Sequence, residues 1–142
     1  MSNTVMKLDR LAAKHAQEVV KQANPDIEIT VTKALGVLQE DGVYACFLYL
    51  LAKEKENGKV VVDKMLNLLG DGDDGLKFNW GRPNSSKPED ILSHLTEKVT
   101  VNLERLLLAK ETLEQMLIYA RYGVKARQDI EPENGQAEEK QT

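Results

Sequence analysis

Apolar residues recur along most of this chain at spacings of three and four positions, the pattern of an amphipathic helix. Over residues 5–23 the pattern predicts a first helix, which Asn24 and Pro25 end because proline lacks a backbone N–H. The residues on its apolar side are Leu8, Leu11, Ala12, Ala16, Val19, Val20 and Ala23.

A second predicted helix covers residues 27–39, although the β-branched run at 27–32 also suits a short strand. We favour the helix because Val31, Ala34 and Leu38 continue the helical spacing. Residues 43–56 are apolar on nearly every side, so we expect a helix buried at the centre of the molecule.

The second half of the chain contains one long irregular stretch. Asn57 and Gly58 are expected to end the central helix, and residues 60–69 predict a short one. Glycine, aspartate, asparagine, serine and proline then dominate residues 70–87, which predicts a long loop. Loops of this length are often functional or mobile.

Two further helices are expected after this loop. Pro88 suits a first helical turn with Ser86 or Lys87 near the cap, so a short helix should run to about residue 95. The longest helix is predicted over residues 99–126. Its apolar face comprises Leu103, Leu106, Leu107, Leu113, Met116, Leu117, Ala120 and Val124.

These elements predict an all-α fold, a compact bundle of five to six helices with one long central loop. The 142 residues fit a single domain, which we place at residues 1–127. Residues 128–142 hold five acidic side chains and one lysine and lack apolar periodicity, so we expect a disordered acidic tail. This tail accounts for the whole net charge of −4, leaving eighteen acidic and eighteen basic residues before it.

The sequence offers little reactive chemistry. His15 and His94 lack the spacing of paired metal ligands, and Cys46 lies in an apolar run that suggests a packing role. We therefore expect no catalytic residue, metal or cofactor, although an unfamiliar carboxylate site of a small hydrolase would escape this reasoning. Residues 1–10 lack a secretory signal, no apolar run is long enough to span a membrane, and a single cysteine suits a reducing compartment, so we expect a cytoplasmic protein.

The glycine-rich and acidic residues 70–75 resemble two known ligand-binding loops only superficially. Counted from Asp71, an EF-hand would need glycine at the sixth position and glutamate at the twelfth, where Leu76 and Arg82 stand. The three aspartates would repel a phosphate, and no Gly-Lys-Ser/Thr follows. A solvated acidic loop is the simpler interpretation.

Trp80 and Arg82 are the candidate partner contacts. They lie in the predicted loop, and tryptophan and arginine often anchor protein interfaces. The alternative is that the Trp80 side chain folds back to cap the core. Both interpretations are open at this point.

Two basic stripes are the candidate nucleic-acid contacts. One follows the first helix, where basic residues recur at spacings of three, four and seven, and the other follows the last helix. Such stripes can track a phosphate backbone, but ordinary solvated helix faces look similar. The candidate residues are Lys7, Arg10, Lys14, Lys110, Arg121, Lys125 and Arg127.

Three segments carry a resemblance to a known family: AAKHA at 12–16, VLQEDGVYACFLYLLAK at 37–53 and AKETLEQMLIYARYGVKA at 109–126. Together they resemble the small helical subunit of type III CRISPR effector complexes, especially of the Cmr type. The chain departs from the usual pattern at Tyr119 to Tyr122, where a tryptophan-containing segment is common, and in its long loop.

The resemblance implies a non-enzymatic subunit of an antiviral ribonucleoprotein. Its partners would be other subunits of the complex and copies of itself, and its seven candidate basic residues would contact the backbone of guide RNA and target strand. Such contact needs positive charge rather than base recognition. The alternative function is a protein-only adaptor or inhibitor that binds its partner through residues 70–87 around Trp80.

Overall fold

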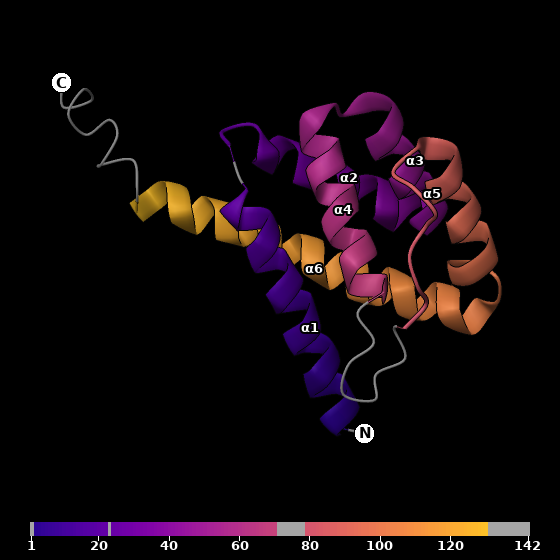
Figure 1. The fold of residues 1–142 in the computed structure, drawn as a ribbon. Coiled ribbons are helices and arrows are strands. Elements are labelled where there is room, and N and C mark those ends of the chain that lie inside the picture. Colours follow the sequence, from indigo (N-terminus) through magenta and orange to yellow (C-terminus); the bar gives the residue numbers. More distant parts are fainter. Residues whose placement is uncertain (1, 23, 71–78, 131–142) are drawn as a thin grey trace.

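The computed structural model describes residues 2–22, 24–70 and 79–130, and side chains within these ranges from Lys7 to Arg127. The described chain is all-α (Figure 1). Its α-helices are α1 (Ser2–Lys21), α2 (Ile27–Asp41), α3 (Val43–Lys53), α4 (Glu56–Gly70), α5 (Pro88–His94) and α6 (Leu103–Ile130), and a π-helical turn, η1 (Leu95–Val99), follows α5. The predicted compact helical bundle is confirmed.

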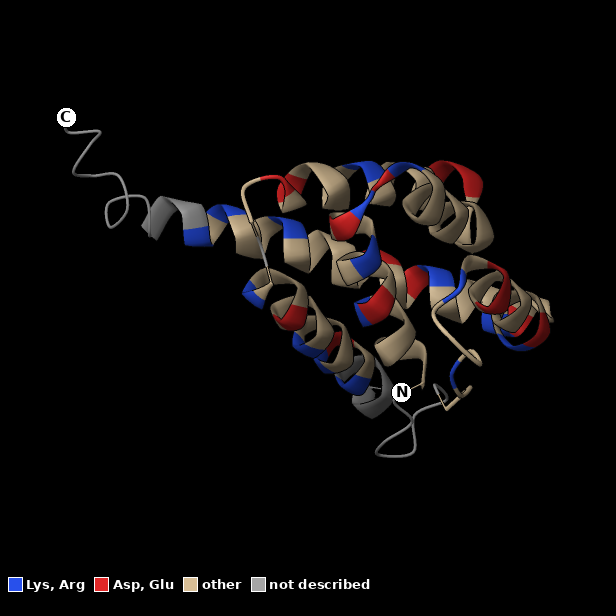
Figure 2. Ribbon diagram, turned by 45° about the horizontal axis from the view of Figure 1, so that its top comes forward, with Lys and Arg blue, Asp and Glu red and all other residues tan. Residues whose placement is uncertain are grey.

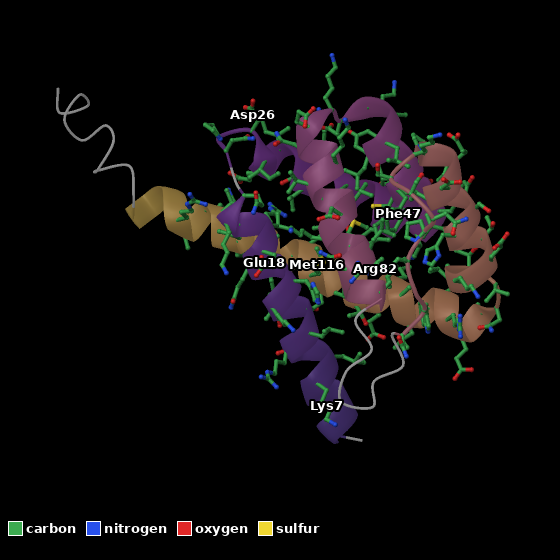
Figure 3. The ribbon with its side chains drawn as sticks, viewed as in Figure 1. Lys7, Glu18, Asp26, Phe47, Arg82 and Met116 are labelled. Atoms are coloured by element: carbon green, nitrogen blue, oxygen red, sulfur yellow. The ribbon has the colours of Figure 1, made fainter. Side chains whose placement is uncertain are left out.

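The long helix α6 organises the bundle. It packs against α1 on one flank and α2 on the other, while α4 contacts α1 and α3. Figure 1 shows α1 crossing α6 at a steep angle and α5 lying near the opposite end of α6. Phe47 of α3 and Met116 of α6 lie inside the bundle (Figure 3), and both side chains are fully buried.

The turns between the first helices follow from local chemistry. The Asn24 side chain accepts a hydrogen bond from the backbone N–H of Asp26 at 2.9 Å, which forms an Asx turn before α2. Gly42 separates α2 from α3 with φ of 102°, a value that side chains other than glycine rarely adopt. Its N–H donates to the carbonyls of Val37 and Leu38 and so closes the end of α2.

The β-branched run at residues 27–32 is helical, as favoured. Ile27, Thr30 and Val31 are buried, and together with Ala34 and Leu38 they form one inward side of α2. The three-and-four spacing therefore outweighs the local strand preference of the run.

The boundary predicted at Asn57 and Gly58 is wrong, because both lie in the first turn of α4. Gly58 is required there by packing: a Cβ atom at this position would lie 2.5 Å from the carbonyl oxygen of Leu50. Glycine thus lets α4 approach the backbone of α3. The predicted end of the domain at residue 127 also falls inside a helix, since α6 continues to Ile130; residues 131–142 of the predicted tail lie outside the described residues.

The predicted burial of α3 and the predicted apolar face of α6 are each wrong in part. On α3, Tyr44 is 37% exposed and Leu48 is 44% exposed, so the helix keeps one solvent-facing apolar side. On α6, Leu103 and Leu107 are exposed although the predicted apolar face includes them. The hydrogen bond from the Gln39 side chain to Glu114 lies near the end of α2. Leu107 lies about two helical turns beyond Glu114 along α6, so α2 does not cover it. No helix among the described residues has the length and apolar character needed to cross a lipid bilayer.

Candidate nucleic-acid interface

The position of α1 is set by its contacts with α6. Ala12, Ala16 and Val19 are buried on its inner side. A close approach is possible because α6 has glycine at the crossing, where a Cβ on Gly123 would lie 2.7 Å from Cγ2 of Val20. Shape at the contact therefore fixes the outer side of α1 toward solvent.

Three candidate residues form an exposed basic ridge on that outer side. Lys7, Arg10 and Lys14 are all exposed, and their spacing of three and four keeps them along one side of the helix. Figure 2 shows the corresponding basic bands along α1, and Figure 3 places Lys7 toward its N-terminal end. We call these three residues the α1 ridge. Lys21 extends it, but its ammonium lies 3.4 Å from Glu18.

The basic residues at the end of α6 do not join the α1 ridge into one surface. Nζ of Lys125 lies 2.6 Å from Oε2 of Glu28 on α2, whereas the Arg127 guanidinium donates to the carbonyl of Val20 on α1. Residues two positions apart are about 200° apart around a helix, so the two side chains serve opposite flanks of α6. Both contacts hold neighbouring helices to α6.

Lys110 and Arg121 are half-buried. The Nε atom of Arg121 is buried, and no described residue accepts a hydrogen bond from it. Of the seven residues suggested by the sequence, Lys7, Arg10 and Lys14 thus share one exposed side, whereas Lys125 and Arg127 contact neighbouring helices and Lys110 and Arg121 are half-buried.

The candidate partner contacts differ from each other. Trp80 is only 6% exposed, its backbone N–H donates to Leu69 at 3.3 Å, and the Arg105 guanidinium lies 4.9 Å from its ring centroid. The Trp80 side chain therefore folds back onto the core. The prediction that Trp80 is an exposed partner contact is wrong. Arg82 is exposed and donates to the Asn67 side chain.

The nucleophile and metal candidates are buried or unclustered. Cys46 is fully buried, its thiol donates to the Ala34 carbonyl at 3.4 Å, and burial raises its pKa to about 12. Burial also lowers the pKa of His94. In the described ranges, no three His, Cys, Asp or Glu side chains are grouped as metal ligands. The acidic loop from Asp71 lies outside those ranges.

No protein-family model, no curated protein and no solved structure matches this chain.

A groove that the sequence did not predict lies beside α3 and α4. Its volume is about 700 Å³, and its far wall is the segment at residues 82–88 together with Ile91 of α5. The one available signal was the density of lysine, arginine and proline in two short stretches, 53–59 and 82–88. That signal names no partner, because nothing in the sequence shows that the two stretches face each other.

Proposed function

We propose that this chain is a non-enzymatic subunit of a type III CRISPR ribonucleoprotein and that its α1 ridge contacts the sugar-phosphate backbone of RNA. One observation carries the proposal: Lys7, Arg10 and Lys14 are exposed along a single side of α1. Cations so arranged along one helix can follow successive phosphates without reading bases. The resemblance of the three sequence segments supplies the class of complex.

Two of the four basic residues of α6 have a different role in this proposal, and the other two, Lys110 and Arg121, are half-buried. Lys125 and Arg127 hold α2 and α1 against α6, so they position the α1 ridge instead of contacting RNA. This division narrows the RNA contact from seven residues to three. It also predicts that variants on the two helices fail in different ways.

The direct test is RNA affinity over a salt series. Each phosphate contact on a single strand contributes about −0.7 to the slope of log K against log salt. Arg10→Glu removes one such contact and adds a negative charge, so it should flatten the slope by at least about 0.7 and weaken binding most at low salt. Lys53→Glu is the matched control, because Lys53 is also exposed and charged but lies at the end of α3. If both variants lose RNA affinity equally, RNA is attracted by the charge of the protein in general and not by the α1 ridge.

The class of complex needs its own test. The chain should co-purify with guide RNA when expressed together with the other subunits of a type III CRISPR locus. The Lys7→Glu/Arg10→Glu/Lys14→Glu variant should lose guide RNA or target strand while its helical circular dichroism is unchanged. Absence of the wild-type chain from the assembled complex would refute this function.

The adaptor function receives less support. It depended on Trp80 as an exposed anchor, and that indole is buried under Arg105. Arg82 remains exposed, however, and it lines the groove described above.

A further inference from the structure

We infer that the groove between α3, α4 and residues 82–91, here called the α3–α4 groove, is a binding site for a small apolar monoanion. The ligand class is a molecule with an aliphatic or aromatic body and one carboxylate or sulfonate group, of which a medium-chain fatty acid is an example. This site is independent of the α1 ridge. Four properties of the groove support the inference: its apolar floor, its basic rim, its fixed far wall and its volume.

The floor of the groove is apolar. Leu50 and Leu51 contribute from α3, Val62 and Leu66 from α4, and Ile91 from α5. Four of these five side chains are buried in the core, so the floor is part of the packed interior. An apolar ligand body placed there would lose its contact with water, and this loss favours binding.

The rim of the groove is basic. Four cationic and two acidic side chains line the groove, a net charge of +2; they are Lys55, Lys59, Arg82, Lys87, Glu54 and Asp63. All four cationic residues are exposed, so their charges lie at the mouth and not on the floor. This separation suits a ligand with an apolar body and an anionic end.

The two acidic side chains are already engaged. Glu54 accepts hydrogen bonds from Tyr49 at 2.6 Å and from Thr30 at 2.8 Å, and the Tyr49 bond lowers its pKa. Asp63 lies 3.5 Å from the ammonium of Lys64, which is not a lining residue. The acids are thus partly compensated from outside the groove. Among the cations, Lys59 lies 3.9 Å from Glu56 and Arg82 donates to Asn67, and an incoming anion would compete with both of these exposed contacts.

The far wall is held in place by several contacts. Trp80 anchors its start in the core, and Gly81, with φ of 83°, turns the chain toward α5. Ser85 donates to Asp90 at 2.5 Å and accepts from the backbone N–H of Lys87 at 3.0 Å. Pro83 and Pro88 restrict the backbone further. Because this wall is already fixed before a ligand binds, little conformational entropy of the protein is lost on binding.

The size of the groove favours a small molecule. Ligand sites in proteins usually measure about 300–1,000 Å³ and combine apolar walls with a few polar groups. The groove, at about 700 Å³, falls inside that range. A phosphate backbone carries one charge per nucleotide and has no continuous apolar body, so it matches the rim but not the floor.

A pair of fluorescent probes tests the proposal on the full chain. 8-Anilinonaphthalene-1-sulfonate carries the required anion, and N-phenyl-1-naphthylamine is an uncharged compound with the same rings. The anionic probe should saturate one site and bind about tenfold more tightly, a difference of about 1.4 kcal/mol. Decanoate should displace it. Equal affinity of the two probes would overturn the inference, as would displacement by single-stranded RNA but not by decanoate.

Variants locate the site. Lys59→Glu should weaken the anionic probe about tenfold and leave the neutral probe unchanged, whereas Lys53→Glu, outside the groove, should affect neither. Leu51→Trp should fill the groove and abolish binding of both probes. If Lys53→Glu weakens the anionic probe as strongly as Lys59→Glu, the effect is general charge and the groove assignment is wrong.

A measurement on the unaltered protein covers the case in which a variant unfolds. In an amide NMR titration with decanoate, the shift changes should fall on residues 50–66 and 82–91. Changes centred instead on the exposed apolar residues Tyr44, Leu48, Leu103 and Leu107 would overturn the inference.

Discussion

The α1–α6 crossing and the α3–α4 contact both depend on a glycine, but the glycines face different obstacles. At Gly123 an added Cβ would meet the methyl carbon Cγ2 of Val20, whereas at Gly58 it would meet the backbone oxygen of Leu50. A side chain can be shortened or rotated, but a helix backbone must move as a unit. The first contact positions the α1 ridge and the second supports the α3–α4 groove, so the two proposed sites should differ in their tolerance of substitution.

The largest effect is expected from Gly58→Ala. The new methyl group would force α4 away from α3, and overpacking of this kind costs about 1–3 kcal/mol, here toward the upper end. The midpoint of urea denaturation should fall, and binding of the anionic probe should weaken. Gly36→Ala is the control, because Gly36 is an exposed helical glycine with open space around it and should gain up to about 1 kcal/mol. A neutral Gly58→Ala would mean that the two backbones are not in contact.

Gly123→Ala should cost less, about 1 kcal/mol, because the gain in helix propensity offsets part of the clash with Val20. Adding Val20→Ala should relieve the clash, so the double variant should be more stable than the sum of the single losses predicts. A double-mutant cycle in urea measures this coupling. Strict additivity would show that the two residues do not meet.

The hydrogen bond from Tyr49 to Glu54 is the next test on the groove side. This bond raises the pKa of Tyr49 to about 12 and lowers that of Glu54. Tyr49→Phe should reduce the free energy of unfolding by somewhat under about 1 kcal/mol, the usual value for one partly exposed bond. Tyr119→Phe, which removes the corresponding bond to Asp9 between α6 and α1, is the matched variant. A larger loss of unfolding free energy in Tyr119→Phe than in Tyr49→Phe would contradict the expectation that the groove side is the less tolerant of the two.

The smallest effect concerns pH. The pKa of His94 is lowered in the folded state, chiefly by burial, so the unfolded chain binds more protons just below the ordinary pKa of about 6.5. The stabilisation due to His94 is therefore complete above that value and is lost as the pH falls through it. Urea midpoints at pH 7.5 and 5.5 should differ less in His94→Gln than in the wild type. His15 is present in both proteins, so the difference isolates His94; an unchanged pH dependence would contradict the assignment.

Helix type and order followed from the spacing of apolar residues, but the exact partners of each helix did not. The pattern at Ile27, Val31 and Ala34 outweighed β-branching because tertiary burial favours one side of a helix. Gly58 was misjudged because a glycine that ends a helix and one that permits close packing look the same in sequence. Leu103 and Leu107 were misjudged for a related reason: spacing identifies an apolar side but not the point where the covering helix stops.

The candidate sites were only partly predictable. Exposure of Lys7, Arg10 and Lys14 follows from their place opposite the apolar side of one helix, which spacing alone reveals. The uses of Lys125 and Arg127 depend on Glu28 and on the carbonyl of Val20, residues about a hundred positions away. The α3–α4 groove likewise depends on two distant segments meeting, which no local pattern encodes.

Cys46 makes opening of the core measurable by chemistry. It is the chain's single cysteine, it is fully buried between α2 and α3, and its thiol donates to the Ala34 carbonyl. Only the thiolate reacts with alkylating reagents, and a thiol with a pKa of about 12 is almost entirely protonated at neutral pH. Modification therefore requires α2 and α3 to separate. The rate of labelling by a maleimide or iodoacetamide thus measures how often the core opens, without any added reporter group.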